Sequence, residues 1–279
     1  MPSRFVRPVL ILLFLALFFV LGVIKWGDRP GEKPVDRASV LERYGFYLEE
    51  VGKTVGINFM HQAPVLDSKL DHIMPHIASM GAAVSVVDYD RDGWQDLYVT
   101  NSRTESRNRL YRNQNGQGFR EMDLGVGNVN RAGTGVSIGV VWGDYDNDGF
   151  EDLFLYKWGR PELFRNQNGK GFKRVTEVGL PDWINAGSAI WVDYDCDGYL
   201  DLFVAGYWPE SLDLWRLKTT KMMPESFEYA RNGGRKYLLR NRGNGTFEDV
   251  TEQAGIHSRR WTLAVAAADL NGSGYPDLF

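Results

Sequence analysis

The sequence contains one cysteine, Cys196, and four histidines among its 279 residues. A single cysteine excludes an intrachain disulfide, and histidines without further cysteines give no Cys/His zinc cluster. No glycine-rich loop precedes a helical pattern, which removes the usual phosphate-binding motifs. No nucleophile and base converge in the pattern, so we expect neither catalytic residues nor an organic cofactor. We expect no nucleic-acid partner either.

Long apolar runs are also scarce, and the one that exists lies at the N-terminus. Residues 9–24 are sixteen uninterrupted apolar residues, flanked by Arg4 and Arg7 before them and Lys25 after them. We interpret residues 1–26 as an uncleaved signal anchor, with residues 8–26 contacting the membrane; a cleaved signal peptide is the alternative. Either segment predicts export to the cell envelope or extracellular face, anchored or secreted. Residues 27–44 are a linker, in which a short helix near residues 39–47 is expected.

Four stretches share the pattern D-x-[DN]-x-[DS]-G-x-x-D, in which positions 1, 3, 5 and 9 carry oxygen ligands and position 6 is glycine. We call them loops 1 to 4; they are residues 88–96, 144–152, 193–201 and 269–277. Carboxylates this close repel one another unless a hard cation neutralises them, and oxygen-only ligation favours Ca²⁺ over Zn²⁺. The predicted ligand side chains are Asp88, Asp90, Asp92 and Asp96; Asp144, Asp146, Asp148 and Asp152; Asp193, Asp195, Asp197 and Asp201; and Asp269, Asn271, Ser273 and Asp277.

The EF-hand is the competing interpretation of these loops, and it needs a glutamate at position 12 and a helix on each side. Position 12 is instead Val99, Leu155 or Val204. The flanking segments are short runs of β-branched and aromatic residues, which favour strands. The sequence therefore predicts that each loop lies at the tip of a β-hairpin.

The loops belong to a longer repeat. Residues 109–116, 162–169 and 237–245 match one another, and residues 172–177 match 247–252. Asn-Gly pairs in these segments are typical of tight hairpin turns. One unit is therefore four antiparallel strands in about fifty residues, the size of a propeller blade. The predicted fold class is an all-β propeller at residues 45–279, preceded by an N-terminal hydrophobic helix.

The last spacing between loops is longer than the others because it contains an insertion at about residues 208–236. Its aromatic residues Trp208, Trp215 and Tyr229 could stack on sugars, or they could pack the insertion onto the blade. Both interpretations remain open from the sequence.

Residues 48–57 resemble residues 247–256 in spacing and predict an outer strand without its own inner strands. The sequence ends within the fourth repeat, so we expect the chain to be the N-terminal part of a longer protein. Closed propellers often complete a blade with a strand from the other end of the chain, which removes an open sheet edge.

The loops, the LYRN-type turns and the F-x-DVT-type strands resemble FG-GAP and VCBS repeats of integrin-α-like propellers. "FEDVTEQAGI", "GINFMH" and "DYDNDG" resemble more narrowly the cartilage acidic protein family, whose bacterial members carry an ASPIC/UnbV region. The resemblance covers about residues 45–279. It implies a seven-bladed propeller, about half of it present, with Ca²⁺ bound also by the backbone carbonyls of Trp94, Phe150 and Tyr199.

The function expected from these features is that of a membrane-anchored, exported, calcium-binding module for protein or glycan recognition or adhesion, without enzymatic activity. The alternative is the propeller part of a calcium-dependent extracytoplasmic enzyme, such as a polysaccharide lyase or phospholipase, whose catalytic residues lie outside this chain. Fold alone does not choose between them.

Loop 4 should bind metal more weakly than the other three loops, because it offers two carboxylates and two neutral groups instead of four carboxylates. We compare Asp148→Ala with Asp277→Ala in the complete protein by counting bound metal at saturating Ca²⁺. The first change should remove about one ion and the second less, because loop 4 is expected to be often empty. Equal losses at the two positions would contradict this ranking.

Overall fold

The computed structural model describes residues 36–77, 80–219, 223–226 and 229–279. The predicted signal anchor at residues 1–26 lies outside these ranges, as does the expected hydrophobic helix. In the ranges that are described, no helix combines the length and the apolar character needed to cross a bilayer. The chain divides into two compact units, Met1–Glu50 and Val51–Phe279.

The first unit contains helix α2 (Arg37–Tyr44), which begins two residues before the helix expected from the sequence. The side chain of Asp36 caps its N-terminus by accepting a hydrogen bond from the Ala38 N–H at 3.2 Å. Gly45 ends the helix in a left-handed conformation with φ of 74°. Short polar capping residues thus fix both ends of a helix that buries no side chain.

The regular secondary structure of the second unit begins with the short helices η1 (Ser68–Leu70) and α3 (Met74–Ile77). All the later elements are antiparallel strands. The strands are short, as expected for β-branched and aromatic runs between glycine-rich turns. Their bounds are β1 (Val84–Val87), β2 (Asp96–Val99), β3 (Arg109–Asn113), β4 (Phe119–Met122), β5 (Gly135–Gly143), β6 (Asp152–Gly159), β7 (Glu162–Asn166), β8 (Phe172–Val175), β9 (Ile184–Val192), β10 (Asp201–Trp208), β11 (Lys236–Asn241), β12 (Phe247–Asp249), β13 (Ala267–Ala268) and β14 (Asp277–Leu278).

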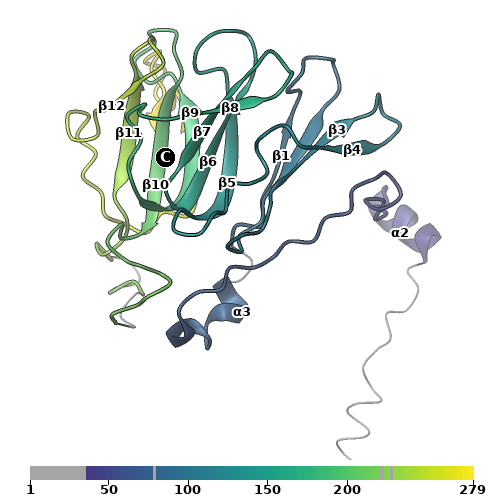
Figure 1. Ribbon diagram of the computed structural model, residues 1–279, viewed down its shortest axis with the longest axis horizontal. Coiled ribbons are helices and arrows are strands. Elements are labelled where there is room, and N and C mark those ends of the chain that lie inside the picture. The colour runs from purple at the N-terminus through teal and green to yellow at the C-terminus, as the bar shows by residue number, and fades with distance from the viewer. Residues whose placement is uncertain (1–35, 78–79, 220–222, 227–228) are drawn as a thin grey trace, which may run out of the picture. The chain divides into compact units, whose positions relative to one another are not determined.

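Each repeat forms a four-stranded antiparallel unit, which we call a blade. Blade 1 is β1-β2-β3-β4, blade 2 is β5-β6-β7-β8 and blade 3 is β9-β10-β11-β12, while β13 and β14 begin the next repeat. Blades 2 and 3 also pair directly where β6 ends and β9 begins, through Trp158 with Asn185 and Gly159 with Ile184. Figure 1 shows β5 to β12 side by side, with β1 next to β5. The all-β, antiparallel prediction is confirmed, whereas the number of blades in a closed ring stays a prediction.

Tryptophans at matching places in β5 and β9 fill the space between blades. Trp142 meets Tyr98 of blade 1 edge-on at 6.0 Å between ring centroids and contacts Phe172 at 5.7 Å. Trp191 stacks on Tyr145 of blade 2 at 6.3 Å with an interplanar angle of 12°. Aromatic pairs of this kind contribute about 0.5–1.5 kcal/mol beyond the burial of their area. Adjacent blades are therefore held mainly by apolar side chains.

A backbone hydrogen bond repeats at each blade's outer strand. The first residue of β4, β8 or β12 donates its N–H to a carbonyl in the segment that comes before that blade. The three bonds are Phe119 N to Val55 O at 2.6 Å, Phe172 N to Leu124 O at 3.0 Å and Phe247 N to Val178 O at 2.7 Å. The same tie thus links each blade to the chain that precedes it.

The prediction of an outer strand at residues 48–57 is wrong for residues 52–56, which form a turn, while a strand at residues 48–50, which align with β12, stays a prediction. Val55 N donates back to Val51 O at 3.0 Å and Ile57 N to Gly52 O at 2.8 Å, which curls the backbone. The similarity to residues 247–256 lies in the turn, where Ala254 and Ile256 make the equivalent backward bonds. The segment occupies the position of the connections that precede blades 2 and 3.

Asn166 provides a test of the link between blades 1 and 2. Its side-chain amide donates to Tyr89 O at 2.9 Å and to Glu151 O at 3.0 Å. Asn166→Ala leaves buried carbonyls without a donor, which costs about 1–3 kcal/mol for each unsatisfied group. Chemical denaturation should show this loss, whereas the exposed neighbour Gln167→Ala should change stability by less than about 0.5 kcal/mol. Equal effects of the two changes would contradict a role of the Asn166 side chain in linking blades 1 and 2.

Candidate metal sites at the hairpin tips

The first three loops lie at the tips of hairpins, as the sequence predicts. Loop 1 joins β1 to β2, whose register pairs Val87 with Asp96. Loop 2 joins β5 to β6 and loop 3 joins β9 to β10 in the same way. Loop 4 joins β13 to β14, with Ala268 opposite Asp277. Position 9 of each loop is therefore the first residue of a strand, which fixes its carboxylate against the sheet.

The carboxylate at position 1 organises the backbone of each loop. In loop 1, Asp88 accepts from the N–H of Asp92 at 3.0 Å and from the N–H of Gly93 at 2.9 Å. Gly93 has φ of 88°, a left-handed conformation that only glycine adopts without strain. Loops 2 and 3 repeat both hydrogen bonds at 2.8–3.0 Å. The glycine at position 6 is required because the backbone amides must turn toward one carboxylate.

The carboxylate at position 9 is fully buried in loops 1, 2 and 3. Asp96 accepts from Tyr89 N at 3.3 Å and from Asn113 N at 2.7 Å, and Asp152 and Asp201 accept equivalent bonds. Burial raises the pKa of Asp152 to about 8 and the pKa of Asp96 and of Asp201 to about 6, because desolvation disfavours the charged form. A cation beside these groups would favour their ionised form.

An arginine from the third strand of each blade holds the carboxylates at positions 3 and 5. In loop 1, Arg112 Nε contacts Asp90 Oδ2 at 2.6 Å and its terminal nitrogen contacts Asp92 Oδ2 at 2.9 Å. Arg165 and Arg240 bridge the same two positions in loops 2 and 3. One guanidinium therefore neutralises part of the charge at each hairpin tip.

The loop motif by itself does not predict these arginines as members of the site. The sequence signal for them is the Arg-Asn pair that ends β3, β7 and β11, at Arg112-Asn113, Arg165-Asn166 and Arg240-Asn241. The asparagine of each pair donates its backbone N–H to the position-9 carboxylate. Both residues of the pair thus serve the loop, although the sequence suggests only a hairpin turn.

The second oxygen of the position-3 carboxylate has no hydrogen-bond partner. Asp90 Oδ1, Asp146 Oδ1 and Asp195 Oδ1 are all buried and all unpaired. A buried acceptor without a donor costs about 1–3 kcal/mol, and the same oxygen is left in three independent loops. The neighbouring groups are carboxylates, which accept hydrogen bonds and do not donate them. A cation is therefore the partner that fits this oxygen.

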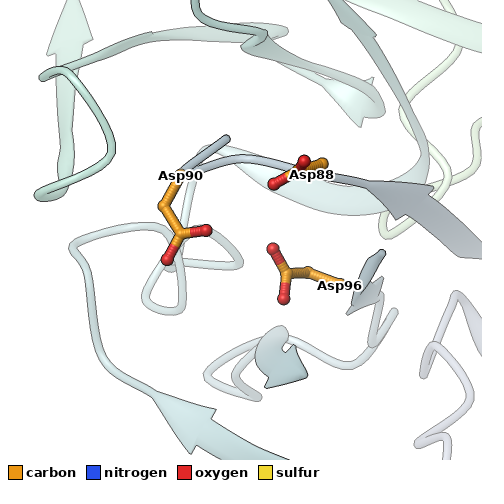
Figure 2. Close-up of side chains that lie close together, drawn as sticks. All are labelled: Asp88, Asp90 and Asp96. Carbon is orange, nitrogen blue, oxygen red and sulfur yellow. The ribbon is translucent and has the colours of Figure 1, made fainter. Parts of the chain in front are cut away.

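Among the residues that the structure describes, three clusters of aspartates could hold a metal ion. The oxygens that each cluster offers lie within 4.8 Å of one another; the clusters are Asp88, Asp90 and Asp96; Asp144, Asp146 and Asp152; and Asp193, Asp195 and Asp197. Figure 2 shows the first cluster, whose carboxylates point toward one another. The remaining carboxylates of these loops and the carbonyls of Trp94, Phe150 and Tyr199 stay predicted ligands.

Loop 4 differs in the way the sequence suggests. The Asn271 amide donates to Asp277 Oδ2 at 3.3 Å, and Ser273 N donates to Asn271 Oδ1 at 2.8 Å. Asp269 still accepts from Gly274 N at 2.8 Å, so the loop keeps its backbone shape. Neutral groups here satisfy one another, and among the described residues loop 4 contributes no group of three acids.

Successive loops touch through the residue at position 4, which has φ of 56–58° in loops 1, 2 and 3. This left-handed conformation directs the side chain toward the following loop. The contacts are Arg91 over the Phe150 ring at 5.6 Å, Asn147 Nδ2 donating to Gly198 O at 3.0 Å and Cys196 Sγ donating to Gly274 O at 3.5 Å. The four loops therefore form a continuous row.

These features define a class of protein made of four-stranded repeats with an acidic hairpin loop in each. The sequence profile of the FG-GAP-like repeat matches residues 88–155, 144–204 and 229–279, which together exceed half of the chain. The chain belongs to the family of FG-GAP-like repeat proteins. A search of curated proteins found no match.

Among solved structures, the chain is similar to an Agrocybe aegerita lectin described as recognising non-reducing terminal N-acetylglucosamine. The two are 16% identical, with a TM-score of 0.42 over 70% of this chain and 46% of the lectin. The chain thus spans about half the length of that lectin. A similarity at this level gives no information on which ligand this chain binds.

Replacing Arg165 tests whether the arginine positions the loop carboxylates. In Arg165→Met, the carboxylates at positions 3 and 5 lose their guanidinium partner. The repulsion between them should increase more in the metal-free loop than in the metal-bound loop, where the cation offsets it. The rise in melting temperature on adding Ca²⁺ should therefore be larger than in the unchanged protein. Lys173→Met, an exposed lysine on β8, is the control and should leave that rise unchanged. A smaller rise in Arg165→Met than in the control would contradict a positioning role.

Proposed function

We propose that this protein is an exported, calcium-binding module that recognises a protein or glycan and performs no catalysis of its own. The observation that carries the calcium assignment is the unpaired, buried oxygen at position 3 of three successive loops. A chance defect would not recur at the same atom in three blades. The proposed ion supplies the missing partner of each oxygen.

Calcium is the cation that suits the donor set. Every candidate donor is an oxygen, which favours a hard cation over zinc or copper. Four carboxylates and one guanidinium leave three negative charges per loop, so a divalent ion leaves only one. The arginine holds the outer oxygens of positions 3 and 5, while the inner oxygen of position 3 remains available. Calcium also tolerates the irregular coordination that a flexible loop provides better than magnesium does.

The proposed role of the ion is structural. It would join both strands of a hairpin, because positions 1 and 3 follow one strand and position 9 begins the next. The row of contacts between loops would then spread this rigidity from blade to blade. A rigid set of blades is a suitable support for recognition loops at the other strand ends.

We also propose the overall architecture and the membrane anchor that the sequence predicts. The repeats would belong to a closed, seven-bladed propeller, and residues 8–26 would anchor it in a membrane on the exported side. The narrower likeness to the cartilage acidic protein family also stays a prediction. Membrane fractionation of the full chain, with protease accessibility of the repeat region, tests the anchor and its orientation.

Melting of the full chain in EDTA, millimolar Mg²⁺ and millimolar Ca²⁺ tests the calcium assignment. A ligand that binds only the folded state adds about 2.7 kcal/mol per site at one hundred times its dissociation constant. We expect the highest melting temperature in Ca²⁺ and the lowest in EDTA. Asp146→Ala, which removes an unpaired oxygen, should reduce the difference more than Asp277→Ala. Superimposable melting curves in EDTA and Ca²⁺ would contradict the proposal that the protein binds calcium.

A further inference from the structure

A pocket of about 590 Å³ lies at the strand ends opposite the metal loops. Its lining includes Gly135, where β5 begins, Trp183, which comes just before β9, and residues 210–213, 215 and 216, which follow the end of β10. The loops instead join the end of β5 to β6 and the end of β9 to β10. Metal and pocket therefore occupy opposite ends of the same strands.

The inserted segment after β10 is fixed against the blades where it forms the pocket wall. Leu214 and Leu217 are buried, and they belong to the same apolar cluster as Trp158 and Trp208. Asp67 fastens the segment by donating its N–H to Leu214 O at 2.9 Å and accepting from Leu217 N at 2.8 Å. This part of the insertion is therefore preformed, which lowers the ordering cost of binding.

The insertion both packs on the blades and lines the pocket: the packing interpretation is confirmed for Trp208, whereas stacking on a sugar stays a prediction for Trp215. Trp208 is buried against Trp158 at 4.7 Å between ring centroids and is not available to a ligand. Trp215 lines the pocket with Trp183, and the two indoles meet at 87° with centroids 6.3 Å apart. The right-angled pair forms an aromatic corner in the pocket wall.

The charged side chains of the pocket balance one another in sign. Arg131 and Arg216 are cationic, and Glu210 and Asp213 are anionic. Arg131 is paired with Glu162, and Glu210 accepts two contacts of 2.9 Å from Arg259. These contacts hold two of the four groups in place, and Glu162 is shared with Lys157 and Arg174.

The other two charged groups are directed to solvent and offer hydrogen bonds. Asp213 uses Oδ1 to accept from Trp215 N at 3.0 Å, and the side chain is exposed. Within the described residues, the exposed guanidinium of Arg216 has no charged partner. A ligand with several hydroxyl groups can accept from Arg216 and donate to Asp213 at the same time.

One residue of the pocket lining, Gly135, must be glycine because it lies tightly against the backbone of β6. A Cβ at Gly135 would lie 1.9 Å from Trp158 O, and φ there is 79°, so no larger residue fits. Gly133 and Ala132 beside it are exposed and carry little or no side chain.

We propose that this pocket binds an uncharged carbohydrate, which deepens the proposed recognition function and rests on it. A pyranose ring has an apolar C–H face that packs on indoles and hydroxyl groups that bond to arginine and carboxylate. Balanced charge in the wall disfavours an ionic ligand, because any net charge would face a group of like sign. The mixture of an aromatic corner and a few fixed polar groups matches small-molecule sites in general.

Calorimetric titration of the full chain in Ca²⁺ tests the proposal with defined probes. The uncharged probes are maltotriose, cellotriose and mannotriose, and the comparison ligands are trigalacturonate and tri-alanine. We expect at least one uncharged trisaccharide to bind, and neither comparison ligand. Trp215→Ala and Arg216→Ala should each weaken binding by about tenfold, which corresponds to about 1.4 kcal/mol.

Tyr229→Ala is the matched control, because this tyrosine is 70% exposed in the same insertion and does not line the pocket. It should leave the affinity unchanged. Trp215 packs partly against the apolar cluster, so melting curves accompany each variant. If Trp215→Ala fails to fold, the exposed Arg216 alone decides the outcome.

The proposal is overturned if a cooperatively melting protein binds none of the three sugars, or if it binds only trigalacturonate or tri-alanine. It is also overturned if sugar binding survives both pocket variants at full affinity. Sugar binding without any effect of Ca²⁺ on melting would instead contradict the calcium assignment and leave the pocket proposal standing. The two failures are therefore distinguishable in one set of samples.

Discussion

Each of the first three hairpin tips confines four aspartate carboxylates within nine residues, and the surrounding repeat is arranged around that charge. Two like charges a few ångströms apart in a partly buried site repel by several kcal/mol. Several donors offset this repulsion. Backbone N–H groups bond to position 1, an arginine bonds to positions 3 and 5, and the backbone N–H of an asparagine bonds to position 9. Only the inner oxygen of position 3 is left without a partner. The proposed cation completes this arrangement.

The same constraint connects the loops to the packing of the blades. Asn166 and Asn241 donate from their backbones to position 9 of their own loop, and from their side chains to a carbonyl of the preceding loop. A change at one hairpin tip therefore reaches the interface with the previous blade. Together with the row of position-4 contacts, this makes the loop end of the strands a continuous polar layer above the apolar interfaces.

The opposite strand ends follow different rules. Loops 1 to 4 all lie at the other end, and here the chain departs from the repeat through the insertion after β10. Trp208 and Leu214 fix the insertion to the core, which leaves Trp215 to form part of a cavity wall. The hairpin loops repeat at one end of the strands, whereas the connections differ at the other end. Proteins that present recognition loops on a rigid scaffold usually show this division.

Much of this arrangement could be predicted because it is local in the sequence. The nine-residue loops, their flanking strands and the four-stranded repeat all follow from spacing and residue type within about fifty residues. The turn at residues 52–56 was mistaken for a strand because its apolar spacing is shared with a true strand-turn segment. Backward hydrogen bonds, which spacing does not reveal, decide between the two.

Features that depend on contacts between distant residues could not be predicted. Arg240 reaches a loop carboxylate 45 positions earlier, at Asp195, because the insertion lies between them in the chain and not in space. The aromatic corner likewise joins Trp183 and Trp215 across a whole hairpin. In both places the residue types were visible in the sequence, but their partners follow only from the fold.

The most direct test of the account is a crystal structure of the full chain grown in Ca²⁺, with anomalous diffraction data to locate the ion. The account predicts a calcium peak in each of loops 1 to 3, about 2.3–2.6 Å from Asp90 Oδ1, Asp146 Oδ1 and Asp195 Oδ1. The arginines should remain on the outer oxygens. Density for water or an arginine nitrogen beside these three oxygens, without an anomalous peak, would contradict it.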